Sequence, residues 1–164
     1  WVLIGLIAMA IGGMATLAIL ISGAAGNPLV KQLTFPQIIL FVWVLSSTIE
    51  EIFTRGFIQS NLAKGMDISK RVPFLRVDFP TFIGAAVFAL MHLVLWLSGT
   101  DLKTMLITIL FTFSLGLLAG HQRAKSGSLI PAIGVHMLAN IGGLIGGIIY
   151  AVVTFLASGK LPMR

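Results

Sequence analysis

The chain has 164 residues, of which 57% are hydrophobic and only 10% are charged, and its formal net charge is +6. Soluble globular domains carry about 25% charged residues. This composition, with a mean hydropathy of +1.04, therefore excludes a soluble domain and indicates a polytopic membrane protein. The absence of cysteine excludes a thiol nucleophile, disulfides and thiolate metal ligands. The cations lie between apolar stretches, so we interpret them as determinants of membrane topology and expect no nucleic-acid partner.

Five apolar segments are long enough to cross the hydrocarbon core, which takes about 20 residues of helix. In chain order they cover approximately residues 1–22, 34–62, 80–98, 101–120 and 128–158. Pro36 and Pro80 stand in the first turns of the second and third segments, and Asp101 is placed to cap the fourth. The apolar runs are continuous rather than alternating, which disfavours a β-barrel. We predict an all-α, polytopic bundle of five to six transmembrane helices with a polar site inside the membrane.

The fifth apolar segment is longer than one straight span requires. Thirty residues of helix extend about 45 Å, against a hydrocarbon core of about 30 Å. Gly142-Gly143 and, one turn later, Gly146-Gly147 predict a kink or a break at this point. The same glycines could instead form a packing face for a neighbouring helix, and both interpretations stay open.

The loop charges give an orientation. Six cations lie in the connections 63–79 and 121–127, whereas the other side of the membrane holds Lys31, Lys103, Lys160 and Arg164. This excess places the first group in the cytosol. The sequence begins at Trp1, inside an apolar segment and without Met, so we expect a single integral-membrane domain over 1–164 whose natural N-terminus is missing.

Two adjacent glutamates, Glu50 and Glu51, lie inside the second apolar segment, although the chain has only five acidic residues. An acidic side chain at the bilayer centre costs roughly 2.5–3.5 kcal/mol on insertion scales, so it marks a functional site by default. Arg55 follows Glu51 by four residues, a spacing that predicts an intrahelical ion pair. Glu50 has no such partner in its own helix, which makes it the better candidate for chemistry.

Three polar side chains in other segments are predicted to lie near the depth of Glu50. Counted from the basic side at about 1.5 Å per residue, Glu50, His92 and Asn140 each lie about 18 Å deep. His136 lies near 12 Å on the same count, and it shares a helix face with Asn140, four residues later. We therefore predict one polar cavity bounded by these four side chains and open towards the cytosolic, basic side.

These residue types suit hydrolysis. A carboxylate such as that of Glu50 can act as general base on a water molecule, and His and Asn N–H groups can stabilise the oxyanion of a tetrahedral intermediate. Alternatively, Glu50, His92 and His136 are acceptable zinc ligands that leave a fourth position for water, although the spacing H-E-x-x-H is absent. We favour the mechanism without a metal or other cofactor.

Buried polar groups also serve other kinds of membrane protein. No G-x-S-x-G elbow occurs, and the three aspartates lie in loops or at a helix cap, at Asp67, Asp78 and Asp101. A non-catalytic membrane scaffold or a proton-coupled transporter could use the same groups, because intramembrane carboxylates and histidines also form proton relays. Transporters often consist of repeated halves, and we find no internal repeat, so this remains the alternative.

Three short motifs occur in order, each inside an apolar segment: E-E-x-x-x-R at 50–55, F-x-x-x-H at 88–92 and H-x-x-x-N at 136–140. Together they resemble the CAAX prenyl endopeptidase family, also called the bacteriocin-processing (CPBP or Abi) family of intramembrane proteases. Residues 127–131, Gly-Ser-Leu-Ile-Pro, also look like this family. The resemblance covers approximately residues 35–145, which we take as the catalytic core.

The resemblance implies a role for each motif residue. Glu50 would be the catalytic base, assisted by His92, and His136 and Asn140 would bind the oxyanion, with Glu51 and Arg55 in support. It implies an endopeptidase of the lipid bilayer that cleaves a membrane-embedded or lipid-anchored protein or peptide, in a prokaryotic plasma membrane. Neither the substrate sequence nor a protein partner can be read from these motifs.

Overall fold

The structure is a computed structural model that describes residues 1–24, 28–67, 69–73 and 75–160. Arg164, one of the cations used for orientation, lies outside these residues. Within the described residues the chain is helical, and its only β-type pairing is an isolated antiparallel bridge between Arg71 and Asp78. The helical elements are α1 (Val2–Ile21), α2 (Pro28–Lys31), α3 (Phe35–Gln37), η1 (Ile38–Ser46), α4 (Ser47–Glu51), η2 (Ile52–Gln59), α5 (Ser60–Gly65), α6 (Phe79–Met91), α7 (Val94–Leu97), α8 (Leu102–Ser126) and α9 (Ile130–Ser158).

Five helices in the described part of the chain are long and apolar enough to cross a membrane. They are Val2–Ile21, Phe35–Gly65, Phe79–Leu97, Leu102–Ser126 and Ile130–Ser158. The second of these, which we call span 2, joins α3, η1, α4, η2 and α5 without interruption, and the third joins α6 to α7. The predicted all-α bundle of transmembrane helices is thus confirmed, with five spans.

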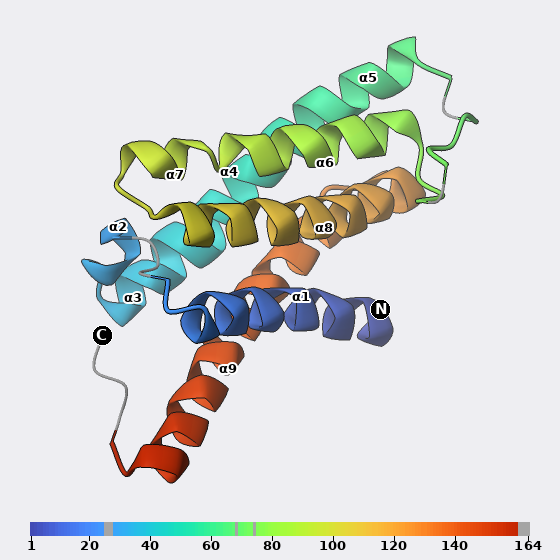
Figure 1. Cartoon of the computed structure of the whole chain (residues 1–164). Coiled ribbons are helices and arrows are strands. Elements are labelled where there is room, and N and C mark those ends of the chain that lie inside the picture. Colours follow the sequence, from blue (N-terminus) through green and yellow to red (C-terminus); the bar gives the residue numbers. More distant parts are fainter. Residues whose placement is uncertain (25–27, 68, 74, 161–164) are drawn as a thin grey trace.

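The ends of the bundle differ in character. At one end α5, the start of α6 and the end of α8 lie together, and we call this the basic end because of Lys64, Lys70, Arg71, Arg123 and Lys125. The opposite end is formed by α2, α3 and α7, and α9 crosses α1 before it extends away from the other helices (Figure 1).

Span 2 departs from regular α-helical geometry. Its segments η1 and η2 are π-helical, a winding with i→i+5 hydrogen bonds. In an α-helix, side chains four residues apart drift by about 40° per step, because each residue turns by about 100°. A π-helical turn holds more residues, so this drift is reduced, and Ser47, Glu51, Arg55 and Gln59 remain on one face. All four are buried.

Side-chain caps fix the start of two spans. Asp78, two residues before the proline in the first turn of α6, accepts a hydrogen bond at Oδ1 from the Thr81 N–H at 2.8 Å. Asp101 Oδ1 accepts from the Thr104 N–H at 3.1 Å at the start of α8, as the sequence predicts. These caps satisfy backbone donors that a helix leaves unpaired, and they set where each span enters the membrane.

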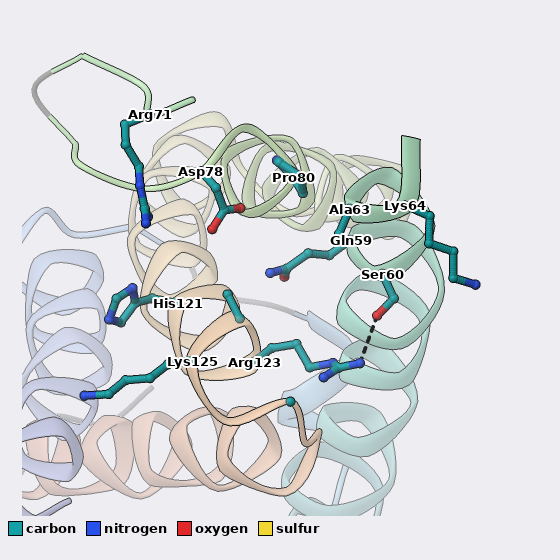
Figure 2. A pocket seen from close by; sticks show the side chains of 12 residues that line it. Gln59, Ser60, Ala63, Lys64, Arg71, Asp78, Pro80, His121, Arg123 and Lys125 are labelled. Carbon is teal, nitrogen blue, oxygen red and sulfur yellow. Dashed lines mark hydrogen bonds between the residues drawn. The ribbon is translucent and has the colours of Figure 1, made fainter. Parts of the chain in front are cut away.

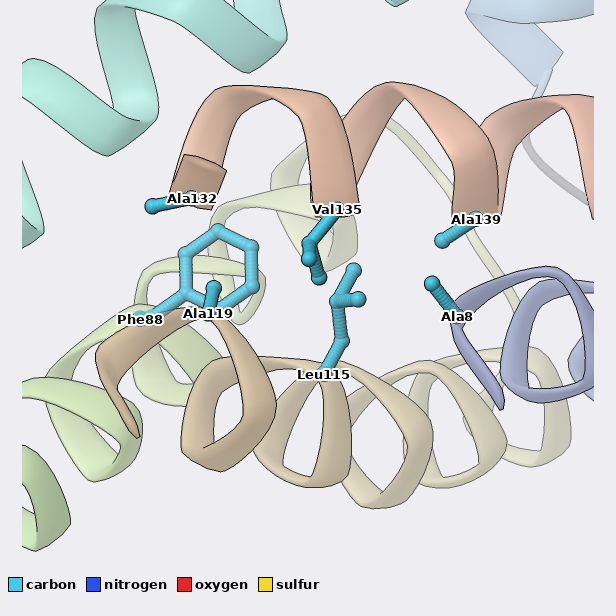
Figure 3. Close-up of a cluster of buried hydrophobic side chains, with 7 residues drawn as sticks. All are labelled: Ala8, Phe88, Leu115, Ala119, Ala132, Val135 and Ala139. Carbon is cyan, nitrogen blue, oxygen red and sulfur yellow. The ribbon is translucent and has the colours of Figure 1, made fainter. Parts of the chain in front are cut away.

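A small apolar core joins four helices. Its buried members come from α1, α6, α8 and α9, and most are alanines (Figure 3): Ala8, Phe88, Leu115, Ala119, Ala132, Val135 and Ala139. Small side chains let helix backbones approach closely, which is the usual basis of association in lipid. Phe88 is the one large residue among them, and it extends this core towards the polar face of span 2.

The glycines of α9 form a packing face on α1. A Cβ atom at Gly142 would lie 2.0 Å from the carbonyl oxygen of Met9, and one at Gly146 would lie 2.6 Å from that of Gly13. The reverse contact is as close, since a Cβ at Gly12 would lie 1.8 Å from the Ala139 oxygen. The break considered at these glycines is not present, because α9 runs as one helix from Ile130 to Ser158. The close approach of two backbones explains the glycines instead.

Gly142→Ala is expected to destabilise the protein by about 1–3 kcal/mol, because the added methyl group overpacks a rigid backbone contact. Gly134→Ala is the matched control in the same helix, since a Cβ there meets nothing within 4 Å. That change should be neutral or stabilise by up to about 1 kcal/mol, through the better helix propensity of alanine. Thermal unfolding in detergent, followed by circular dichroism, measures both, and equal effects would contradict the packing interpretation.

Candidate active site

The buried face of span 2 carries an ion pair that contacts α9. Arg55 Nη1 donates to Glu51 Oε1 at 3.0 Å, which confirms the pair predicted from their spacing. The same carboxylate oxygen lies 3.0 Å from His136 Nδ1. Both members of the pair are fully buried. The guanidinium is held further by Thr54 Oγ1 at 2.6 Å and the Gly116 carbonyl at 3.1 Å, so α8 contributes to its position.

Glu50 occupies a different environment from Glu51. Its side chain is 24% exposed, and its Oε2 atom lies 3.9 Å from His136 Nε2. The Ser46 hydroxyl donates to Glu50 Oε1 from one turn earlier, a partner in its own helix that the sequence analysis missed. The signal was present as Ser46 at the i−4 position. Of the two glutamates, Glu50 is therefore the one whose carboxylate is open to a water molecule or a substrate.

Both histidines have one ring nitrogen engaged. His92 Nδ1 lies 2.9 Å from the Phe88 carbonyl oxygen, and His136 Nδ1 contacts the Glu51 carboxylate. Carbonyl and carboxylate oxygens only accept hydrogen bonds, so each Nδ1 carries a proton and donates. The Nε2 atom of each ring is thereby left for chemistry, and in the neutral imidazole it is an acceptor.

Phe88 links these groups. Its ring packs edge-on against His92 at 5.1 Å and against His136 at 5.3 Å between centroids. The Arg55 guanidinium carbon lies 4.5 Å from the centre of the same ring, a cation–π contact. The buried phenylalanine of the F-x-x-x-H motif thus orients both imidazoles and the guanidinium together.

Asn140 is fixed by span 2. Its Nδ2 atom donates to the Ser47 hydroxyl at 2.9 Å, and Ser47 is fully buried. Ser47 was missed in the sequence because a serine inside an apolar helix more often bonds its own backbone. This contact, with the contact between His136 and Glu51, joins α9 to span 2 at two points one turn apart. The structure therefore brings Glu50, Glu51, Arg55, His136 and Asn140 together.

A cavity of about 390 Å³ lies beside these groups. His92, His136 and Asn140 line it together with apolar residues of α1, η1, α8 and α9. Glu50 is not among its lining residues, so the expectation of one cavity bounded by all four side chains is met only in part. The cavity extends to Phe35 and Val30 at the α2 end, away from the basic end, which differs from the predicted opening. Loop charge determines membrane topology, whereas a cavity forms where helices diverge. The charge of the loops therefore does not predict the direction of the cavity.

The zinc alternative requires at least three ligands around one point. Among the residues that the structure describes, no three His, Asp or Glu side chains are grouped to hold a metal ion. The Nδ1 atoms of both rings are engaged by oxygen atoms, at Glu51 and at the Phe88 carbonyl, which leaves only the two Nε2 atoms as possible ligands. The arrangement therefore does not fit the tetrahedral site that Glu50, His92 and His136 would have to form.

Carboxylate, imidazole and amide groups are buried between the spans of this helical membrane protein, an arrangement that suits an intramembrane hydrolase. A family model described as type II CAAX prenyl endopeptidase Rce1-like matches residues 32–142. The chain belongs to this family, which confirms the resemblance drawn from the three motifs. It is accordingly a CAAX-type intramembrane protease at the family level. No curated protein and no solved structure matched the chain.

Proposed function

We propose that this protein hydrolyses a peptide bond of a membrane-embedded or lipid-anchored protein or peptide, with Glu50 as the general base. The observation that carries the proposal is the pairing of two unlike glutamates around His136. Glu51 is buried in an ion pair, whereas Glu50 is partly exposed and 3.9 Å from the same imidazole. An exposed, hydrogen-bonded carboxylate can receive a proton from water, and a buried one in an ion pair supports structure.

In the proposed mechanism Glu50 takes a proton from water as the water oxygen attacks the scissile carbonyl carbon. His92 accepts a second hydrogen bond from that water through its free Nε2 atom and so fixes its orientation. The Ser46 hydroxyl, which donates to Glu50, holds the carboxylate in one rotamer. After the tetrahedral intermediate forms, Glu50 returns the proton to the leaving amine.

The developing oxyanion is assigned to α9. Asn140 Nδ2 has a second N–H beside the one that it donates to Ser47, and this N–H is available for the oxyanion. His136 donates from Nε2 only as the imidazolium, because its Nδ1 proton is already given to Glu51. Phe88 and Arg55 act as positioning residues, since they contact the imidazoles and Glu51.

The limits and location of the activity are part of the same proposal. We infer that residues 1–164 form a single integral-membrane domain with the catalytic core at approximately 35–145, in a prokaryotic plasma membrane. The cations of the basic end support a cytosolic location for that end. The mechanism uses no metal ion, since each step is assigned to a side chain of this chain.

The proposal is tested with purified protein in vesicles and a set of membrane-anchored reporter peptides, whose products are identified by mass spectrometry. We expect cleavage that persists in the presence of a chelator. Asn140→Ala should lower kcat by about 10²–10³-fold, the usual effect of losing one oxyanion donor. Asn61→Ala, an exposed asparagine of α5, is the control and should leave kcat unchanged. Loss of cleavage with chelator and its return on adding Zn²⁺ would overturn the metal-free mechanism.

A further inference from the structure

A second cavity, of about 570 Å³, lies at the basic end and has no part in the proposed mechanism. It is enclosed by the end of span 2, the start of α6 and the end of α8 (Figure 2). We call it the basic pocket. Its main polar lining residues are Gln59, Ser60, Arg71, Asp78, His121 and Arg123.

The residues that line the basic pocket carry an excess of positive charge. Four lining residues are cations and a single one is acidic: Lys64, Arg71, Arg123 and Lys125 against Asp78. Within the described part of the chain, none of the four cations forms an ion pair. Asp78 is itself engaged as the cap of α6. A cavity with unneutralised cations on several walls concentrates anions.

Arg123 is held at the wall of the pocket. Its Nη2 atom donates to the Ser60 hydroxyl at 3.1 Å (Figure 2), and Ser60 in turn donates to the Arg55 carbonyl. The Nε atom of Arg123 is buried without an acceptor among the described residues. Arg71 reaches the pocket from the other side, because its backbone pairs with that of Asp78. Guanidinium groups match the geometry of phosphate oxygens and bind them through paired hydrogen bonds.

The deep wall of the pocket contains an acceptor atom, Gln59 Oε1, that has no hydrogen-bond donor among the described residues. Gln59 Nε2 donates to Thr81 Oγ1 at 2.9 Å and to the Gly120 carbonyl at 3.0 Å. Since that carbonyl only accepts, the orientation of the amide is fixed, and Gln59 Oε1 is the buried atom left without a partner. A ligand that fits the whole pocket therefore combines an anionic group with a hydroxyl.

The position of the basic pocket in the membrane indicates which class of anionic ligand it binds. It is formed by residues at the ends of three spans, so it lies at the level of the lipid headgroups. Basic pockets between transmembrane helices at this level bind anionic headgroups. We propose that the basic pocket binds the phosphodiester of an anionic phospholipid whose headgroup carries hydroxyl groups, as phosphatidylglycerol does. Arg71 and Arg123 contact the phosphate, and the headgroup hydroxyls face Gln59 and Asp78.

Native mass spectrometry of the protein in a non-ionic detergent tests this proposal, because it counts bound lipid directly and does not depend on peptidase activity. The protein is titrated separately with phosphatidylglycerol, phosphatidylcholine and inorganic phosphate. We expect saturable binding of one phosphatidylglycerol and at least tenfold weaker binding of phosphatidylcholine. Arg71→Gln and Arg123→Gln should each weaken phosphatidylglycerol binding about fivefold, the effect of one cation near an anionic headgroup.

Two controls separate charge at the pocket from charge in general and from structure. Lys103→Gln removes the same charge from the other end of α8 and should leave lipid binding unchanged. Ser60→Ala removes the hydrogen bond of Arg123 but keeps its charge, so binding should persist. Equal losses in Lys103→Gln and Arg71→Gln, or equal binding of both lipids, would overturn the proposal. Tight binding of inorganic phosphate without phosphatidylglycerol would assign the pocket to a soluble phosphate and overturn the lipid.

Discussion

Glu50→Gln is expected to lower kcat for a membrane-anchored peptide by about 10²–10⁴-fold, the range that a positioned general base contributes. The amide cannot accept the proton of the attacking water, yet it keeps the size of the carboxylate and still accepts from the Ser46 hydroxyl. The melting temperature should therefore stay close to that of the unaltered protein. The two measurements, turnover in vesicles and thermal unfolding in detergent, together separate chemistry from structure.

Ser46→Ala is a graded companion to this test, because it leaves the carboxylate of Glu50 but frees its rotamer. It should reduce kcat by less than Glu50→Gln does. If Glu50→Gln turned over substrate at an unchanged rate, the assignment of the base would be wrong, and Glu51 would be the next candidate because it contacts the same imidazole.

Arg55→Met is expected to destabilise the protein by about 3–5 kcal/mol, because it leaves the carboxylate of Glu51 buried without its counter-charge. The substitution also removes the hydrogen bonds that Thr54 and the Gly116 carbonyl accept from the guanidinium. Methionine still fills much of the volume above the Phe88 ring. Lys103→Met, at an exposed position, is the control and should change stability by no more than about 0.5 kcal/mol. The free energy of unfolding in detergent measures both.

The double variant Glu51→Gln/Arg55→Met tests whether the pair acts as a unit. Once the arginine is absent, removing the charge of Glu51 relieves an uncompensated buried ion, so the two losses should be less than additive. Additive losses would show that Glu51 and Arg55 contribute to the free energy of unfolding only through their other contacts. The contact between Glu51 and His136 is one of these.

The spans and part of the site were predictable because both depend on short-range pattern. Continuous apolar runs gave five helices, and Asp101 was recognisable as a cap from its place before one of them. The pair of Glu51 and Arg55 followed from a spacing of four residues. The common depth of Glu50, His92 and Asn140, counted at the constant rise of an α-helix, stays a prediction.

The rest depends on rotation and contact between helices, which residue counts do not contain. The π-helical winding of span 2 determines which of its polar residues face α9. No residue type in η1 or η2 predicts that winding. Ser47 can be assigned to the site only because it contacts Asn140, a residue 93 positions later in the chain. The direction of the cavity, towards the α2 end, likewise follows from how the helices diverge.

The buried polar face of span 2 also bears on how the protein responds to bilayer thickness. Lipid tails compete for apolar contacts, but they offer no partner for Ser47, Glu51 or Gln59. Span 2 therefore cannot slide or rotate against its neighbours without breaking hydrogen bonds that the hydrocarbon cannot replace. The last buried residue of α9 is Gly146, and the turns after it extend away from the other helices, so this part of the helix can tilt (Figure 1). Mismatch with a thinner or thicker membrane is thus absorbed at the C-terminal part of α9, while the groups around Glu50 keep their relative positions.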